Sequence, residues 1–369
     1  MIPAPCTVSI VIKALNEEQR IAQAIESALA AVACVGGEVV LADSCSTDRT
    51  VDIAIAYPIR IVQLLDPGER SCGIGPQLGF QHSRGEYLYL MDGDMQLQAG
   101  FVEQGLAFLA QHPEVAGAGG ALVERNLANL EYRERHQRMA GSEAHRQPGP
   151  VDRLDGGALY RRRAIAEVGY LSDRNLHSYE EFDLAVRLRA RGWKLWRLPL
   201  EAVSHHGHAE HALRLLWRRW KTGYACGVGE LLRASFGQAW WRMVLRDLLE
   251  LRLYACVIAW WIAMGIAGVL PLEAGQRAGA IAALALLPLA GMTVRKRSLT
   301  RAAYALLSWN VQAAGLLRGL LRRRRPPRRP IASRILREPH DGPHAGATRH
   351  GGLAAMAPVR PGPPPAHQT

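Results

Sequence analysis

Two aspartates one residue apart end a short apolar segment near residue 90. The sequence Leu-Tyr-Leu-Met-Asp-Gly-Asp-Met at residues 88–95 predicts a buried parallel strand whose C-terminal tip opens into a site, with Asp92 and Asp94 leaving the sheet edge together. Carboxylates in this arrangement suit Mg²⁺ or Mn²⁺ shared with substrate phosphates, because these ions keep open coordination positions. An Asp-Gly turn after an ordinary strand explains the same residues without a metal site. The neighbouring motifs must therefore distinguish a metal site from a turn.

A second acidic cluster begins a predicted helix farther along the chain. Glu180, Glu181 and Asp183 fall in the first turn of a helix that we expect to run to about residue 191. The positive end of a helix favours carboxylates at that position. One of them can take a proton from a hydroxyl nucleophile, although acidic residues are also common at ordinary helix starts.

Histidines form a third group of residues whose side chains could take part in chemistry. Three of them lie within residues 205–208, on a loop after a predicted strand at residues 194–198. Histidine nitrogens are common metal ligands, and solvent-exposed or structural histidines explain the pattern equally well.

The elements that must position these residues alternate between strand and helix patterns. The predicted strands of the first quarter are residues 7–12, 38–42, 59–65 and 88–92. The alternation implies crossover connections and an α/β fold with a mostly parallel sheet. Ligands bind at the carboxyl ends of strands in such sheets, where Asn16, Asp43 and Asp92 all fall. We also expect Asn16 to cap the helix after the first strand, and residues 126–146 to form a charged helix.

The charge of the chain is concentrated near its C-terminal end. The formal net charge is +12, but 13 of the 45 Lys and Arg residues lie within residues 295–337, so the other 32 nearly balance the 33 acidic residues. This distribution argues against nucleic acid as a partner over the whole surface and favours local attachment to an anionic surface. The six cysteines form no Cys-x-x-Cys pair, which argues against a disulfide framework or zinc knuckle and favours a reducing cytosol.

The ordered set of motifs resembles the family-two glycosyltransferases, which have the GT-A type of nucleotide-sugar-binding α/β fold. The resemblance covers about residues 8–208. Its motifs are Leu15-Asn16-Glu17-Glu18, Asp43-x-x-Ser46-x-Asp48-x-Thr50, Asp92-Gly93-Asp94, Gly156-Gly157 followed by Arg161-Arg162, and Glu180-Glu181-Phe182-Asp183-Leu184 with Arg187-Leu188 and Gly192. Two departures are that Glu181 replaces the usual Asp, and that the glycine loop at residues 75–79 lacks the basic residue and Asn that the family tends to have there.

The resemblance also implies roles for individual residues. It implies a nucleotide-sugar site at Asn16, Glu17, Asp43, Ser46, Asp48, Asp92 and Gly93, with Asp43 contacting the nucleobase. It implies an acceptor site at Asp155, Gly156 and Gly157, and a catalytic base that we assign to Glu181, with Glu180 and Asp183 as rivals. It implies a divalent metal, Mg²⁺ or Mn²⁺, held by Asp94 and Asp92, with a histidine completing the shell; we choose His206, followed by His205.

The C-terminal half contains two long uncharged segments, residues 253–272 and 278–294. They have 20 and 17 residues, and a membrane span needs about 20, with a range that reaches down to about 17. Arginines flank the pair on both sides, which the positive-inside rule places in the cytosol. A buried or re-entrant helical hairpin is the alternative.

The flanking segments look membrane-associated as well. Tryptophans alternate with arginines within residues 209–252, as in helices that lie in the headgroup layer. Residues 299–321 predict a further amphipathic helix, and an arginine-rich patch follows that would attract anionic lipid. No nucleic-acid recognition fold accompanies this patch, and the composition from residue 338 onward predicts a disordered tail.

These patterns predict a GT-A glycosyltransferase domain at residues 1–208, interfacial helices at 209–252, a transmembrane helical hairpin at 253–294, a basic amphipathic segment at 295–337 and a disordered tail at 338–369. The predicted activity is metal-dependent, inverting transfer of a sugar from a nucleotide donor to a hydroxyl of a glycan or lipid-linked acceptor. The topology predicts a cell inner membrane or plasma membrane location with a cytoplasmic catalytic domain. A nucleotidyltransferase and a non-catalytic membrane scaffold that binds nucleotide sugars remain open.

Overall fold

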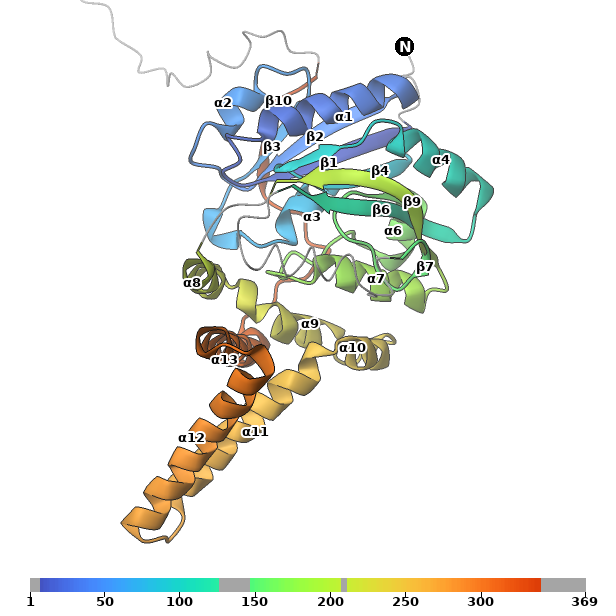
Figure 1. Ribbon diagram of the computed structural model, residues 1–369. Helices are drawn as coiled ribbons and strands as arrows, with labels where there is room; N and C mark the ends of the chain where they lie inside the picture. Colours follow the sequence, from blue (N-terminus) through green and yellow to red (C-terminus); the bar gives the residue numbers. More distant parts are fainter. Residues whose placement is uncertain (1–6, 126–146, 207–210, 340–369) are drawn as a thin grey trace, which may run out of the picture.

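The computed structural model of the chain describes residues 7–125, 147–206 and 211–339. The charged helix expected at residues 126–146, His208 and the tail from residue 340 lie outside the described residues. The described part combines an α/β domain with a set of C-terminal helices, and a long helical hairpin projects from it (Figure 1).

One ten-stranded sheet forms the centre of the α/β domain (Figure 1). Its strands pair in the order β10-β3-β2-β1-β4-β8-β6-β9-β5, and β7 pairs with β9. The strands are β1 (Val8–Ala14), β2 (Gly37–Asp43), β3 (Arg60–Leu64), β4 (Tyr87–Asp92), β5 (Met95–Leu97), β6 (Val115–Glu124), β7 (Gly149–Val151), β8 (Ala158–Arg161), β9 (Lys194–His205) and β10 (Ser333–Arg337).

The sheet is mixed, which corrects the expectation of a mostly parallel one. β1 runs parallel to both β2 and β4, β2 to β3, and β6 to β9. β8 runs antiparallel between β4 and β6, and β5, β7 and β10 also pair antiparallel. β8 therefore separates two parallel sets of strands, β3-β2-β1-β4 on one side and β6-β9 on the other.

Helices cover both faces of this sheet. On one face lie α1 (Ile21–Val35) and α4 (Phe101–Gln111), and on the other α3 (Ile74–Gln81), α6 (Arg162–Val168) and α7 (Glu180–Ala190). The alternation along β1 supplies both cores, since Ile10 and Ile12 pack into the first and Val11 into the second. The short helices α2 (Thr50–Ala54) and η1 (Pro67–Glu69) lie in the loops.

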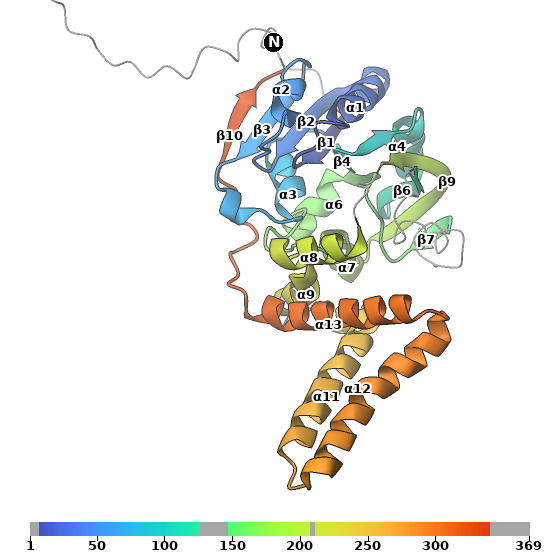
Figure 2. The same cartoon turned by 60° about the vertical axis from the view of Figure 1, so that its left-hand side comes forward.

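Seven helical segments follow β9 in the described part of the chain. They are α8 (Ala212–Thr222), η3 (Tyr224–Cys226), α9 (Gly227–Ser235), α10 (Trp241–Asp247), α11 (Glu250–Val269), α12 (Ala274–Lys296) and α13 (Leu299–Leu321). Four of them, α9, α10, α11 and α13, form a third hydrophobic cluster with α7. α13 spans the predicted amphipathic helix and lies across the base of the domain (Figure 2).

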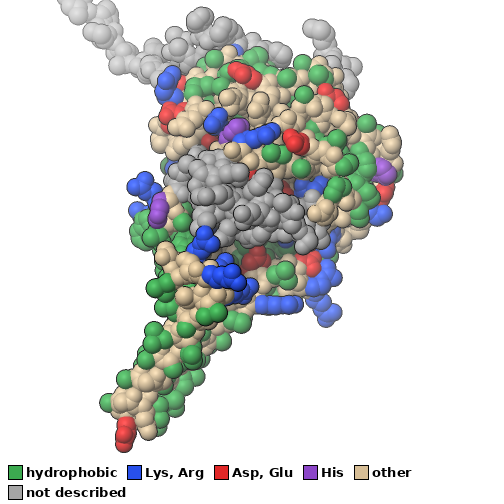
Figure 3. Space-filling view, in the orientation of Figure 1, with side chains coloured by type: hydrophobic (Ala, Val, Ile, Leu, Met, Phe, Trp, Pro, Cys, Tyr) green, Lys and Arg blue, Asp and Glu red, His purple; other side chains and the backbone are tan. Residues whose placement is uncertain are grey.

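The hairpin of α11 and α12 extends away from the rest of the molecule (Figures 1 and 2). Both helices are long and apolar enough to cross a membrane, and little of their apolar surface is covered by protein. Hydrophobic and uncharged side chains dominate the visible hairpin surface, with acidic atoms at the tip (Figure 3). The two predicted uncharged segments therefore correspond to two helices of suitable length and composition for a membrane span.

Residues 322–339 return from α13 to the α/β domain, and we call them the C-terminal strap. The predicted basic patch is part of this strap, but its arginines face acidic residues of the protein: Arg322 lies 3.1 Å from Glu230, Arg324 lies 2.9 Å from Asp173, and Arg325 pairs with Glu69. This arrangement changes one expected domain boundary. These three arginines have carboxylate partners inside the protein, and the domain predicted to end at residue 208 takes a strand, β10, from beyond the hairpin.

Candidate active site

The register of the parallel strands brings three polar residues to one edge of the sheet. Lys13 lies opposite Asp92 in the β1–β4 pair, and Ala14 lies opposite Asp43 in the β1–β2 pair. Because the three strands run in the same direction, their carboxyl ends open at one place. This edge is where the predicted site residues should meet.

Two loops at this edge interlock through hydrogen bonds. Asn16 donates its backbone N–H to Ser46 Oγ at 2.9 Å, and its Oδ1 accepts from the backbone N–H of Thr47 at 2.8 Å. Asp48 accepts from the backbone N–H groups of Glu18 and Thr50 at 3.1 and 2.9 Å. The predicted nucleotide residues on these loops are therefore brought together, mainly by contacts with one another.

The helix cap expected from Asn16 is wrong. α1 begins at Ile21 after Arg20 and has no side-chain cap, whereas Asn16 has a left-handed backbone with φ of 60° and turns toward the second loop. Asparagine tolerates this conformation better than most residues. Asn16 therefore joins the two loops and does not cap α1.

Asp43 is fully buried. Its carboxylate accepts from the backbone N–H of Ser46 at 3.1 Å and from Gln63 Nε2 at 2.7 Å. A cavity of about 330 Å³ lies beside it, lined by Cys45, Ser46, Thr47, Gln63, Leu64, Leu65, Pro67, Arg70 and Arg334. Asp43 supports the wall of this cavity from behind Gln63.

The turn between the two aspartates requires a glycine. A Cβ atom added to Gly93 would lie 2.9 Å from Cγ of Glu17, and the backbone N–H of Gly93 bonds to the carbonyl of Lys13 at 2.9 Å. The close approach holds Asp92 and Asp94 against the end of β1. Gly93 and Glu17, both predicted for the nucleotide site, thus pack against each other.

Lys13 stands at the centre of the acidic cluster. Its Nζ lies 3.1 Å from Asp92 Oδ1, 3.1 Å from Glu180 Oε1 and 3.7 Å from Glu181 Oε1. These four side chains line a narrow cavity of about 30 Å³ together with Pro76, Leu90, Met91, Asp155, Gly156, Tyr160, Leu171, Ser172 and Leu184. Lys13 is not among the residues predicted for the site, although a charged residue directly after the apolar run at residues 8–12 is a signal for it.

Burial and mutual repulsion shift the titration of this cluster. Burial, together with the neighbouring Glu180, raises the pKa of Glu181 to about 8. Burial also raises the pKa of Asp92, opposed by Lys13 and reinforced by Asp94. Glu181 thus has the pKa of a proton acceptor that works near neutral pH.

Asp183 does not reach this cavity, which corrects its standing as a rival base. Its carboxylate accepts from Nε of Arg187 at 2.8 Å, and both side chains are about 1% exposed. Arg187 also donates to the carbonyls of Tyr170 and Leu171 at 2.7 and 2.9 Å. The pair fixes α7 to the preceding loop and is structural.

Asp94 belongs to a second group at the end of β9. Asp94 Oδ2 lies 3.2 Å from Nε2 of His205, whose Nδ1 lies 2.8 Å from Glu124 Oε2. Burial opposes a charge on His205, but the bonds to Asp94 and Glu124 prevail and raise its pKa to about 10. Glu124 was missed by the sequence analysis, since nothing local distinguishes it at the end of β6.

The ring that reaches Asp94 is that of His205, whereas we had chosen His206 first. His206 donates only its backbone N–H to the carbonyl of Asp94, at 3.1 Å, and burial with nearby Arg20 lowers its pKa. Within residues 7–125, 147–206 and 211–339, no group of three or more His, Cys, Asp or Glu side chains forms a metal site by itself. A divalent ion here would need further ligands from a substrate.

The predicted acceptor residues lie beside the acidic cluster. Asp155 pairs with Arg197 at 3.0 Å, and both Asp155 and Gly156 line the narrow cavity with Glu181. Gly157 has φ of +81°, and a Cβ there would lie 2.8 Å from Val203, so a larger residue is excluded.

Left-handed backbone recurs around the site. Asn16, Cys45 and Tyr179 all have φ between 60° and 69°, and Tyr179 directly precedes the acidic start of α7. Non-glycine residues in this region cost about 1–3 kcal/mol each and concentrate at functional sites. The loops that meet at this edge therefore have backbone conformations that are unfavourable by themselves and that the surrounding fold must stabilise.

The sheet, its interlocked loops and the Asp-Gly-Asp turn form an α/β fold of the GT-A type. Residues 9–169 match the model of the family described as Glycosyl transferase family 2. A mannosyltransferase from Pyrobaculum calidifontis, solved with GDP-Man and Mn²⁺, shares the fold with a TM-score of 0.58 at 17% identity, over 86% of this chain and 88% of that one.

Curated relatives are similar over shorter segments. The probable glucomannan 4-beta-mannosyltransferase 15 of Arabidopsis thaliana is 30% identical over 170 residues, which are 42% of this chain and 30% of the relative. The low-salt glycan biosynthesis hexosyltransferase Agl6 of Haloferax volcanii is 40% identical over 90 residues, or 24% of this chain and 21% of the relative. The chain thus spans less than a third of either relative.

Proposed function

We propose that the protein transfers a sugar from a nucleotide-diphosphate sugar to a hydroxyl of a glycan or lipid-linked acceptor. The observation that carries the proposal is the narrow cavity shared by Asp92, Asp155, Gly156, Glu180 and Glu181 at the carboxyl edge of the sheet. The mannosyltransferase and hexosyltransferase names of the relatives support sugar transfer. The interlocked loops after β1 and β2 are the proposed nucleotide end of the site.

The donor set at the end of β4 and β9 fits Mg²⁺ or Mn²⁺. Asp94 with His205 beside it is the proposed protein part of the shell, with Asp92 as a further carboxylate nearby, since such ions bind through one or two carboxylates and substrate phosphates complete the shell. Glu124 holds Nδ1 of His205, which leaves Nε2 directed at Asp94, as is usual for a metal-binding histidine. A divalent ion held there supplies positive charge beside the diphosphate as it leaves.

Glu181 is the proposed catalytic base. It takes the proton of the acceptor hydroxyl while the hydroxyl oxygen forms a bond to C1 of the sugar and the bond from C1 to the diphosphate oxygen breaks. A single displacement of this kind inverts the anomeric centre. Lys13 balances the charge of Asp92 and Glu180 next to this base, so that Glu181 can be deprotonated in an acidic surrounding.

The hairpin is the proposed membrane anchor. Arg252 lies in the first turn of α11, and Arg295 and Arg297 lie at the end of α12, which favours a cytoplasmic catalytic domain at a cell inner membrane or plasma membrane. A membrane-held enzyme with this orientation suits the assembly of a surface polysaccharide or glycolipid. The acceptor would then reach Glu181 from the membrane side.

The test is the release of nucleoside diphosphate by the full-length protein in membranes, scanned over donor sugars with Mg²⁺, Mn²⁺ or a chelator. We expect turnover with a divalent ion, none with chelator, and loss of the response to metal in Asp94→Ala. A properly folded protein that binds a donor and turns over none with any acceptor would be a scaffold, and the proposal would fail. Release of pyrophosphate in place of nucleoside diphosphate would identify a nucleotidyltransferase.

A further inference from the structure

The C-terminal strap reaches the nucleotide end of the proposed site. Its strand β10 pairs antiparallel with β3 at the edge of the sheet, with Arg334 opposite Gln63 and Ser333 opposite Leu64. The backbone N–H of Leu65 continues the pairing to the carbonyl of Ala332 at 3.1 Å. A segment that follows the hairpin by more than thirty residues therefore forms part of the domain edge (Figure 2).

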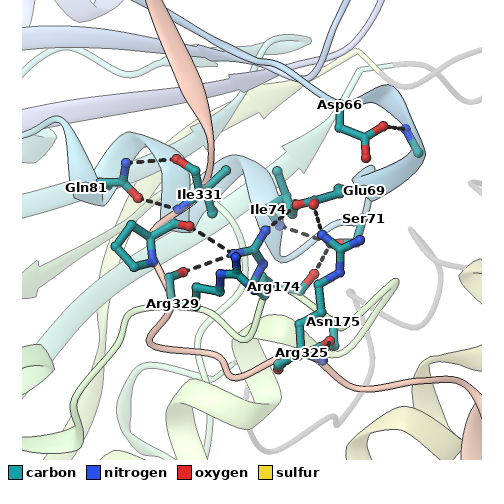
Figure 4. A network of polar contacts seen from close by, with 12 residues as sticks. Asp66, Glu69, Ser71, Ile74, Gln81, Arg174, Asn175, Arg325, Arg329 and Ile331 are labelled. Atoms are coloured by element: carbon teal, nitrogen blue, oxygen red, sulfur yellow. Dashed lines mark hydrogen bonds and ion pairs between the residues drawn. The ribbon is translucent and has the colours of Figure 1, made fainter.

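A dense polar network fixes the path of the strap before β10 (Figure 4). Arg174 donates to the carbonyls of Arg329 and Pro330 at 2.9 and 3.2 Å. Gln81 bonds both backbone groups of Ile331, at 3.1 and 2.8 Å. Glu69 pairs with both Arg174 and Arg325. These contacts set the register in which β10 meets β3.

The register places Arg334 in a chain of side chains that ends at Asp43. Nε of Arg334 donates to Gln63 Oε1 at 2.9 Å, and Gln63 Nε2 donates to Asp43 Oδ2 at 2.7 Å. Each amide atom of Gln63 thus has one fixed partner. Arg334 orients Gln63, and Gln63 stands between Asp43 and the cavity of about 330 Å³.

The charged side chains that line this cavity are Arg70 and Arg334. Arg70 directs its guanidinium to the backbone, with Nε 2.8 Å from the carbonyl of Ser44 and Nη2 bonded to the carbonyl of Cys45. The charged wall is thus made of hydrogen-bond donors, and guanidinium groups pair well with carbonyl oxygens. Such a wall complements a ligand edge that carries acceptors.

We propose that Arg334 is a specificity residue of the donor site, which rests on the proposed function. With Gln63, it reads the base of the nucleoside diphosphate and favours a base that presents a carbonyl oxygen at the edge remote from the ribose. Uracil and guanine present O4 and O6 there, whereas cytosine and adenine carry an amino group. Asp43 acts through Gln63 as a positioning residue.

The experiment measures the affinity of the full-length protein in nanodiscs for UDP, GDP, CDP and ADP with Mn²⁺, by calorimetry. We expect UDP or GDP to bind at least tenfold more tightly than CDP and ADP. Arg334→Ala should weaken the preferred nucleotide by about ten- to hundredfold, as for loss of a charged hydrogen bond, and should remove the preference. Arg334→Lys should restore part of it, because one donor and the charge remain.

Arg323→Ala is the matched control, since Arg323 lies on the same strap with its side chain exposed. It should bind all four nucleotides as the unmodified protein does. Unchanged affinity and preference in Arg334→Ala would overturn the inference, and so would an equal loss for all four bases, which would mean a structural role only. If the unmodified protein binds no nucleoside diphosphate, the proposed function itself fails and the inference with it; if it binds them without preference, only the inference fails.

Discussion

The two ends of the site differ in charge and in the origin of their residues. At the proposed transfer end, Asp92, Glu180 and Glu181 surround the ammonium group of Lys13. At the nucleotide end, the carboxylate of Asp43 is enclosed by hydrogen-bond donors, and arginines line the cavity beside it.

This difference separates two tasks. The acidic end can hold a cation with its ionised carboxylates, and it can accept a proton at Glu181, whose raised pKa suits a base. The basic end can only bind, and its selectivity depends on donors fixed in place. The acidic end uses residues from the core strands and α7, whereas the basic end also needs Arg334, which is 271 residues from Gln63 along the chain.

The largest expected effect separates proton transfer from binding. Glu181→Gln should lower kcat by about 10²- to 10⁴-fold, the usual contribution of a general base, with donor affinity nearly unchanged. In the unmodified protein, kcat should rise with pH and level off above a pKa of about 8, since the base must lose its proton. Steady-state kinetics from about pH 6 to pH 9.5, with donor binding measured separately, checks both.

The control for this variant is Glu201→Gln, whose side chain is 56% exposed and lies in an ion pair of 3.9 Å with Arg125. It should keep full activity and the same pH profile. If Glu181→Gln kept its activity, Glu181 would not be the proton acceptor of the acidic end. Glu180 would then become the base to test.

The next effect in size concerns stability. Asp183→Ala leaves Arg187 charged in a fully buried place, which costs about 3–5 kcal/mol when one partner of a buried pair is removed. Thermal unfolding of the full-length protein should report the loss, while kcat per folded molecule and its pH profile should stay near those of the unmodified protein at low temperature.

Replacing both partners tests whether the unpaired buried charge causes the loss of stability. Asp183→Leu with Arg187→Met should recover much of the stability lost in Asp183→Ala, because no buried charge remains at this pair. A loss of kcat in Asp183→Ala without a loss of stability would instead return Asp183 to the transfer end as a base.

A smaller effect tests the lysine of the acidic end. Lys13 holds down the pKa of Glu181, so Lys13→Met should raise that pKa further and move the rise in kcat to more alkaline pH. If the pKa of Glu181 rises by about 1, activity near pH 7 should fall about tenfold and recover as the pH increases. The exposed Lys194→Met is the control; a uniform loss at every pH would mean that Lys13 does not tune the base.

The sequence predicted those parts that depend on local pattern. The apolar strand ending in Asp92, the acidic start of α7 and the bounds of α13 follow from periodicity and short motifs. The sequence did not predict β8 and β10, because no local pattern encodes which strand each of them pairs with. Glu124 was not predicted for the same reason, since its partner His205 is distant in the chain, whereas Lys13 directly follows an apolar run and could have been predicted.

The choice between two adjacent histidines shows the same limit. His205 is the last residue of β9 and turns its ring toward Asp94, whereas His206 follows the strand and contacts Asp94 through its backbone N–H. Which ring turns toward Asp94 depends on the pairing of β5 with β9, where His205 lies opposite Met95. That register is a tertiary property, and the spacing of the histidines carries no information about it.

The smallest expected effect tests how the strap is anchored beyond β10. Glu338 pairs with Arg60 at 3.0 Å but its side chain is 41% exposed, and Arg60 also lies 3.6 Å from Glu38. Pairs of this kind contribute at most about 1 kcal/mol, so Glu338→Gln should lower stability by less than that and the difference should shrink at high salt. Thermal unfolding at two salt concentrations measures it. A larger loss, together with weaker nucleotide binding, would mean that the terminal ion pair, rather than the Arg174 and Gln81 contacts, holds Arg334 at the cavity.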